Sequence, residues 1–152
     1  MAFEQLDDIY REIILDHRRH PRNRNPLERA DISADGLNPF CGDEIHLQIA
    51  LADDGPVSKI GLQVVGCSIN QAAGSMLTEA IEGKTLSEID AVSALFQSLM
   101  AGDSLAEEDR ERLGDLQELE GVRQFPVRIK CALLAWSTLQ DAIDDYRRRL
   151  PK

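Results

Sequence analysis

Apolar residues recur at helical spacing at both ends of the chain and through its middle, which predicts four helices. The first covers residues 3–17, where acidic residues separate the apolar positions. The second opens at Cys67 and stops at Gly83, a residue type that commonly ends helices. Two more are expected over residues 85–100 and 126–149, the last of which begins with a proline and ends in a run of arginines.

Two stretches carry the signature of a capping box, in which a hydroxyl side chain and a Glu three residues later close the start of a helix. Thr85 and Glu88 have this spacing at the start of the third helix. Ser104 and Glu107 repeat it, and we expect them to open a short, highly charged segment that ends near Gly114.

Polar and apolar residues alternate in two stretches, as they do in strands with one face on the core and the other in water. The first stretch covers residues 44–51 and the second residues 60–64, with a turn at 53–56 between them. The two strands should form an antiparallel hairpin. Together with the helices, the hairpin indicates an α+β fold in which a small antiparallel β-sheet packs against several α-helices.

A segment rich in Pro, Asn and Arg, residues 17–28, separates the first helix from the hairpin. Its prolines and asparagines exclude regular helix and predict an ordered or semi-ordered loop. Four arginines of this segment either lie in solvent or dock on an acidic partner surface. They are Arg18, Arg19, Arg22 and Arg24.

The chain has 152 residues, of which 43% are hydrophobic, and neither a long linker nor a change of composition divides it. We therefore expect a single domain over residues 1–152. The formal net charge of −10 repels phosphate backbones, so nucleic acid is not an expected partner. No apolar run approaches the roughly 20 residues that cross a bilayer, and the first residues lack the basic start of a signal peptide. The expected location is the cytoplasm, away from membranes.

The three cysteines are the clearest candidates for metal binding or for a reactive thiol. A reducing cytoplasm does not favour disulfides, so the thiols are either buried in the core or metal ligands. Cys41 lies in a turn before the hairpin, Cys67 at a strand-to-helix junction, and Cys131 in the first turns of a helix. The hairpin brings the first of these beside the second, and the helix starts at the other two favour ionised thiols.

A tetrahedral zinc site needs a fourth ligand beyond three thiolates. Asp43 is the nearest candidate, because alternate residues of an extended segment share a face and Cys41 lies two positions before it. His46 on the hairpin, and His17 and His20 near the end of the first helix, are less favoured alternatives. The cysteines match no compact zinc-finger spacing, so the residues alone support a metal site and buried thiols about equally.

Three short motifs around the cysteines resemble those of the IscU/NifU N-terminal superfamily of iron–sulfur assembly proteins. They read Asn-Pro-Phe-Cys-Gly-Asp at 38–43, Gly-Cys-Ser-Ile at 66–69 and Arg-Ile-Lys-Cys at 128–131. Residues 15–17 and 20–23 are similar to the opening signature of the same superfamily. The resemblance extends over about residues 5–148, nearly the whole chain.

Two departures from the scaffold-type IscU pattern are similar to the SufU branch of the superfamily. Lys130 replaces the histidine that scaffold-type members carry before the third cysteine, and an acidic insertion lies at about 102–120. Members of this branch are zinc-dependent sulfurtransferases that accept persulfide sulfur from SufS, a cysteine desulfurase that contains pyridoxal phosphate. The resemblance thus implies an enzyme of iron–sulfur cluster assembly with a SufS-type partner, and it suggests downstream cluster scaffold proteins of the SUF system as further partners.

The same resemblance implies roles for individual residues. It implies Zn²⁺ held by Cys41, Asp43, Cys67 and Cys131. It also makes Cys41 the sulfur acceptor. Arg128, close to the third cysteine in the sequence, would then steady Cys41 or pair with an acidic group of the partner, unless it is a plain surface residue.

Two other functions stay open at this point. The first is a scaffold that assembles and delivers a [2Fe–2S] cluster on the same residues, since thiolate-rich sites bind iron as well as zinc. The second is a non-catalytic adaptor in which zinc only stabilises the fold.

Overall fold

The structure is a computed structural model that describes residues 12–38 and 42–150. The elements in these ranges are α2 (Glu12–Arg19), β1 (Ile32–Asn38), β2 (Asp43–Leu51), β3 (Val57–Val65), α3 (Ser68–Ile81), α4 (Leu86–Ala101), α5 (Glu107–Leu113), the 3-10 helix η1 (Gly114–Gln124) and α6 (Pro126–Arg149). The described part of the first expected helix is helical and continues two residues further, to Arg19.

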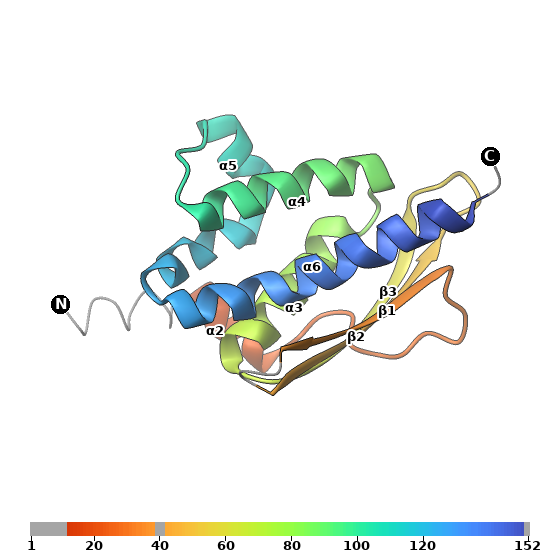
Figure 1. Cartoon of the computed structure of the whole chain (residues 1–152), viewed down its shortest axis with the longest axis horizontal. Helices are drawn as coiled ribbons and strands as arrows, with labels where there is room; N and C mark the ends of the chain where they lie inside the picture. Colours follow the sequence, from red (N-terminus) through yellow and green to blue (C-terminus); the bar gives the residue numbers. More distant parts are fainter. Residues whose placement is uncertain (1–11, 39–41, 151–152) are drawn as a thin grey trace.

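The sheet has three antiparallel strands in the order β1-β2-β3, and all the helices that contact it lie on one face (Figure 1). Burial alternates along β2, where Ile45, Leu47 and Ile49 face the helices while Glu44 and His46 face solvent. The predicted hairpin is confirmed, because β2 and β3 pair in antiparallel register from Glu44 opposite Val65. The predicted α+β fold is confirmed as well.

The pairing of β1 with the outer edge of β2 was not expected from the sequence. This strand carries Asp35, Gly36 and Asn38, residue types that are depleted in strands, and its apolar positions do not alternate regularly. It is a strand because β2 offers an unpaired edge and α6 covers the same face.

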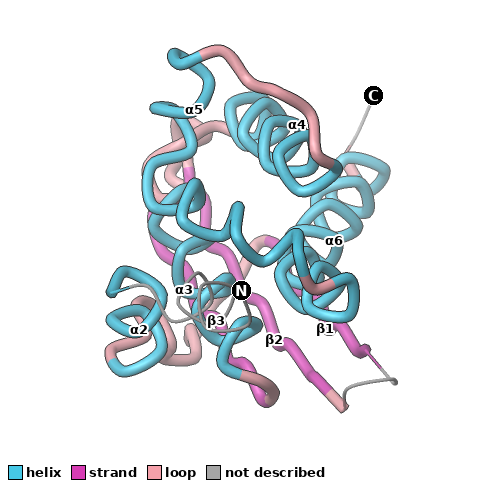
Figure 2. The backbone as a smooth tube through the Cα atoms, turned by 90° about the vertical axis from the view of Figure 1, so that its left-hand side faces the viewer, coloured by secondary structure: helices cyan, strands magenta, loops and turns pink. Residues whose placement is uncertain are grey.

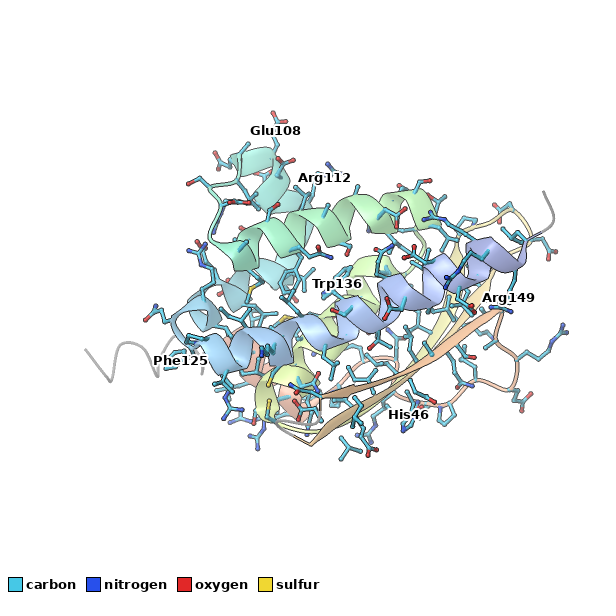
Figure 3. All side chains as sticks on the ribbon, viewed as in Figure 1. His46, Glu108, Arg112, Phe125, Trp136 and Arg149 are labelled. Carbon is cyan, nitrogen blue, oxygen red and sulfur yellow. The ribbon has the colours of Figure 1, made fainter. Side chains whose placement is uncertain are left out.

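Helices α3 and α6 form the layer next to the sheet, with α3 over β3 and α6 along β1 (Figure 2). The approach of α6 is close, because a Cβ built on Gly36 of β1 would lie 2.0 Å from Thr138 Oγ1. Further from the sheet, α4 packs against α6 through Phe96 and Trp136, whose ring centroids lie 5.7 Å apart. Figure 3 shows Trp136 between these two helices. The core therefore fills two interfaces: one between the sheet and the layer of α3 and α6, and one between that layer and α4.

The capping box at the start of α4 is confirmed: the Glu88 N–H donates to Thr85 Oγ1, and the Thr85 N–H donates to the Glu88 carboxylate. The capping box predicted at Ser104 and Glu107 is wrong. Helix α5 begins after Ala106, which has no side-chain cap, rather than after Ser104. The first turn of α5 instead holds three acidic residues, whose charge suits the positive end of the helix dipole.

The segment at about 102–120, an insertion relative to the scaffold-type IscU pattern, is folded into the core. It forms α5 and most of η1, and Leu113, Leu116 and Leu119 are fully buried against α3, α4 and α6. Glu108 of α5 points away from the rest of the molecule (Figure 3), whereas Arg110 of the same helix pairs with Glu120 of η1.

The proline-rich segment before β1 is an ordered loop that covers the free edge of β3. The Leu62 N–H donates to the Asn23 carbonyl at 2.8 Å, and Gln63 Nε2 donates to the Arg24 carbonyl at 2.8 Å. A covered edge cannot pair with a strand of another chain. Within the described ranges, none of the helices has both the length and the apolar character needed to span a bilayer.

The contact between Gly36 and Thr138 makes a testable prediction about stability. Gly36→Ala should lower the free energy of unfolding by about 1–3 kcal/mol, because the new methyl group forces α6 away from β1. Thr138→Ala removes the hydroxyl that the new methyl would meet, so the same Gly36 substitution should cost clearly less in that background. Denaturant unfolding of both single variants and the double variant measures this coupling. Strictly additive losses would contradict the close contact.

Candidate metal site

The packing of both inner helices against one end of the sheet brings three of the predicted ligands together. Asp43 is the first residue of β2, Cys67 precedes α3, and Cys131 lies in the second turn of α6. One ligand atom from each lies within 4.8 Å of the other two. Cys41, the fourth predicted ligand, lies outside the described residues, so its place in the site stays a prediction.

The Asp43 side chain is fully buried at this end of the sheet. Its Oδ1 accepts a hydrogen bond from the Cys67 N–H at 3.1 Å, which ties the start of β2 to the start of α3. Its Oδ2 is buried and has no hydrogen-bond partner among the described residues. A buried carboxylate oxygen without a partner is costly, and a bound cation would remove that cost.

Gly66, which is opposite this carboxylate, makes room for it. A Cβ on Gly66 would lie 2.2 Å from Asp43 Oδ1, so any larger residue would displace the carboxylate or the turn into α3. The space that the Asp43 carboxylate occupies therefore exists because Gly66 has no side chain.

The two thiols lie in different local environments. Cys67 is the N-cap of α3, is partly exposed, and its Sγ accepts the Asn70 N–H at 3.5 Å. Cys131 is fully buried, and its Sγ lies 3.8 Å from the Val127 carbonyl of the preceding turn. Cys67 thus faces both the helix start and the solvent, whereas Cys131 forms the floor of the site.

Arg128 lies one turn before Cys131 on α6 and hydrogen-bonds to both thiol sulfurs. Partial burial works against its charge, but the attraction and the hydrogen bonds of Cys67 and Cys131 outweigh this and raise the pKa of the guanidinium. The guanidinium therefore places a permanent positive charge beside sulfur atoms that carry negative charge when they bind a metal.

These residues fit a zinc ion. Zinc takes thiolates at about 2.3 Å and carboxylate oxygens at about 2.0–2.2 Å, which separates neighbouring ligand atoms of a tetrahedron by roughly 3.4–3.8 Å. The three described ligand atoms need to move by at most about 1 Å to reach those separations. A fourth position remains for one further ligand, and Cys41 lies two residues before Asp43 in the sequence.

The histidines considered as alternative ligands are not part of this group. His46 is exposed on the far face of the sheet (Figure 3), where its Nδ1 lies 2.7 Å from Asp35 Oδ1. His20 is exposed at the end of α2. His17 is buried, but it contacts Ser75 and Asp115 instead.

The surface next to Cys67 was not foreseen from the sequence. A hollow of about 520 Å³ is lined by Cys67, Gln124, Phe125, Pro126, Val127 and Arg128. It lies at the start of α6, where Figure 3 labels Phe125. The side chain of Cys67 is therefore open to approach from outside, along a mostly apolar wall.

Large apolar side chains are exposed around the same end of the sheet. Leu37 of β1 and Val65 of β3 are each 61% exposed, and Val127 of α6 is 64% exposed. The strand register places Leu37 and Val65 on either side of Glu44, next to Asp43. Leu37 and Val65 therefore share the exposed face of the sheet, and large apolar side chains exposed together are typical of a protein contact surface.

Comparisons with known proteins agree with the motifs around the cysteines. Residues 9–152 match the model of the NifU-like N-terminal domain family. The chain is 41% identical to a protein of Bacillus subtilis named zinc-dependent sulfurtransferase SufU, over 94% of this chain and 95% of the relative. It is 34% identical to the iron–sulfur cluster assembly scaffold protein IscU of Streptococcus pyogenes, over 94% of this chain and 87% of the relative.

A solved structure extends this likeness to the fold. A protein of Fervidobacterium islandicum, named FiSufU and described as an iron–sulfur cluster assembly scaffold protein for the SUF system, superposes with a TM-score of 0.82 and 30% identity. The superposition covers 90% of this chain and 98% of that one. The motifs, the fold and the match over residues 9–152 agree: the chain belongs to the NifU-like N-terminal domain family of iron–sulfur cluster assembly proteins.

Proposed function

We propose that this protein is a zinc-dependent sulfurtransferase, which accepts persulfide sulfur from a SufS-type cysteine desulfurase for iron–sulfur cluster assembly. The observation that carries the proposal is the buried carboxylate of Asp43, which faces the thiols of Cys67 and Cys131 with one oxygen that lacks a hydrogen-bond partner in the described ranges. The 41% identity to the Bacillus sulfurtransferase supports zinc as the metal and sulfur transfer as the activity.

Four residues would hold the zinc: Cys41, Asp43, Cys67 and Cys131. When bound, zinc supplies a redox-inert cation that binds thiolates without oxidising them. Four anionic ligands leave the site with a net formal charge of about −2, because the ion contributes two positive charges. Arg128 offsets part of this excess from beside Cys67 and Cys131.

Cys41 is the proposed acceptor. Its thiolate sulfur attacks the outer sulfur of a persulfide on the desulfurase and forms a new S–S bond. The S–S bond of the donor breaks, and its electron pair leaves with the donor cysteine sulfur as a thiolate, which can take up a proton. The transferred sulfur keeps its oxidation state, so the step needs no external oxidant or reductant.

The desulfurase would dock over the exposed end of the site. The exposed residues Leu37, Val65 and Val127 surround this end, and the hollow beside Cys67 opens there. An apolar contact of this kind would exclude water while the two sulfur atoms meet. Downstream scaffold proteins of the SUF system would receive the sulfur at the same surface. This protein would function in the cytoplasm as a single domain.

A scaffold for a [2Fe–2S] cluster is the second candidate, because the Streptococcus and Fervidobacterium relatives are described as scaffolds. The same thiols and carboxylate could bind iron. The residue before the third cysteine is Lys130, however, and an ammonium group cannot replace the neutral imidazole expected of scaffold-type members. Anaerobic reconstitution with iron and sulfide separates the two functions, because a stable visible chromophore that is passed to an apo-protein would support the scaffold.

The first functional prediction concerns zinc content. Asp43→Ala should lower the zinc affinity of the purified protein at least about tenfold, because it removes a ligand from the site. The matched control is Asp35→Ala, which removes a carboxylate that is 80% exposed on β1 and should leave zinc content unchanged. Elemental analysis combined with chelator competition measures both. Equal zinc affinity in the two variants would remove Asp43 from the ligand set.

The second prediction concerns the acceptor thiol. Cys41→Ala should abolish stimulation of the desulfurase, because no thiolate is left to remove sulfur from its persulfide. Mass spectrometry of the unmodified protein, after incubation with desulfurase and cysteine, should find the added sulfur on Cys41. His46→Gln alters a side chain outside the site and should behave like the unmodified protein. Stimulation left intact in Cys41→Ala would refute the role of Cys41, and a persulfide on Cys41 would exclude a purely structural zinc.

The third prediction concerns Arg128. Arg128→Gln should lower both zinc affinity and desulfurase stimulation by about 10–100-fold, because the negative charge of the ligands then loses its neighbouring cation. Arg128→Lys should recover part of the loss, since Lys keeps the charge but not the paired donors. Arg148→Gln removes an arginine that is 76% exposed near the far end of α6 and serves as the control. No difference between the variants at 128 and 148 would show that Arg128 is only a surface residue.

A further inference from the structure

A second group of metal-ligating side chains lies away from the cysteines. It consists of His17 from α2, Glu79 from α3 and Asp115 from η1, with one ligand atom of each within 4.8 Å of the other two. Glu79 lies 12 residues along the chain from Cys67, which is roughly 18 Å along a helix. The two groups are therefore separate sites at opposite ends of α3.

The distances around His17 allow one hydrogen bond from Nε2 and leave the second carboxylate beyond hydrogen-bond range. His17 Nε2 lies 3.0 Å from Asp115 Oδ2 and 3.4 Å from Glu79 Oε1. This nitrogen carries at most one hydrogen, which cannot point at both oxygens, and 3.4 Å exceeds the usual N–H···O range of about 2.7–3.2 Å. Ligand atoms bound to one metal ion at about 2.0–2.1 Å in a tetrahedron lie roughly 3.3–3.4 Å apart, which equals the Glu79 separation and exceeds the Asp115 separation by about 0.4 Å.

The imidazole is held in a fixed orientation. His17 is 1% exposed, and its Nδ1 lies 2.8 Å from Ser75 Oγ. This hydroxyl also accepts the Arg22 N–H at 2.9 Å, and its oxygen has room to accept a second hydrogen bond from Nδ1–H. That tautomer leaves a lone pair on Nε2, the nitrogen beside the two carboxylates. Metal-binding histidines in general donate the other ring N–H to a neighbouring acceptor, as Nδ1–H would here to Ser75.

The carboxylates reach the surface, so an ion can enter from solvent. The side chains of Glu79 and Asp115 are 46% and 51% exposed. Both line a hollow of about 180 Å³ between α3 and η1, from which water could complete the coordination of an ion. A half-open site with one imidazole and two carboxylates would exchange its metal more readily than a closed thiolate site.

The local charges also favour a dication. Arg22 Nε lies 3.5 Å from Glu79 Oε1, and its guanidinium is paired with Asp16. The hydrogen bond that Arg22 donates to the Asp16 carboxylate outweighs partial burial and raises the pKa of Arg22, so this residue stays charged. With neutral His17, three carboxylates and one guanidinium leave a net charge of about −2, which one divalent ion neutralises.

Two further cations, Arg112 and Lys84, line the hollow. Arg112 Nη1 lies 3.8 Å from Asp109 Oδ1. Lys84 helps to lower the pKa of Glu88, although the capping hydrogen bonds from Thr85 are the larger cause. Closest to His17, the carboxylates of Asp16, Glu79 and Asp115 still outnumber the guanidinium of Arg22.

From these observations we propose that His17, Glu79 and Asp115 form a second, exchangeable site for a divalent first-row transition metal of the zinc class. An ion bound here joins α2, α3 and η1, whereas the cysteine site joins the sheet to α3 and α6. The proposal does not depend on sulfur transfer or on the cysteines.

The test is a calorimetric titration of Zn²⁺ into full-length protein that already carries one zinc equivalent. The unmodified protein should take up one further equivalent. The double variant Glu79→Gln/Asp115→Asn should lose this additional binding by at least about 100-fold, since it removes two ligands but keeps their shapes. These side chains are half-exposed, so the variant should stay folded, as circular dichroism would verify. The charge-matched control carries Asp141→Asn and Glu12→Gln, exposed residues outside the cluster, and should bind like the unmodified protein.

The outcomes separate this site from the cysteine site. Loss of the additional equivalent in Glu79→Gln/Asp115→Asn alone supports the second site, even if the cysteines prove to bind a cluster in place of zinc. No additional equivalent in the unmodified protein overturns the proposal. So does equal loss in the control variant, because zinc would then follow the overall negative charge of the surface.

Discussion

Gly36 and Gly66 let other groups approach the sheet at distances that a side chain would prevent. At Gly36 the approaching group is Thr138 of α6, and at Gly66 it is the carboxylate of Asp43. The first contact holds α6 along β1, and the second lets the chain turn from β3 into α3 around a buried acid. Since Cys131 and Cys67 lie on these two helices, the close packing decides where both sulfur atoms are.

The same packing creates an electrostatic problem at this end of the sheet. Asp43 and Cys131 are both fully buried there, and a thiolate or carboxylate away from water is unfavourable unless a positive charge is near. Arg128 supplies one positive charge, and a divalent ion would supply two more. Asp43, Cys67 and Cys131 are thus a group that could hold a cation, and large apolar side chains are exposed at the same end of the sheet.

The elements that the sequence predicted correctly are those with a strong local period. The hairpin of β2 and β3 and the helices α3, α4 and α6 have regular apolar spacing and clear ends, such as the capping box of Thr85 and Glu88. Strand β1 and the 3-10 helix η1 have no such period. Their secondary structure depends on contacts with neighbouring elements. The capping box at Ser104 matched the pattern and was still wrong, since the chain starts α5 two residues later, where acidic residues suit the helix dipole.

The sequence by itself placed Cys67 and Cys131 near helix starts, set Asp43 at the head of a strand, and revealed the family through its motifs. The motifs also predicted that these three residues meet, which the tertiary structure confirmed, and only the tertiary structure showed that Arg128 contacts both sulfur atoms. It alone also placed His17 beside two carboxylates from distant parts of the chain. The physical reason is that local periodicity shows which side of an element faces the core. Which side chains meet there depends on how closely helices and sheet pack.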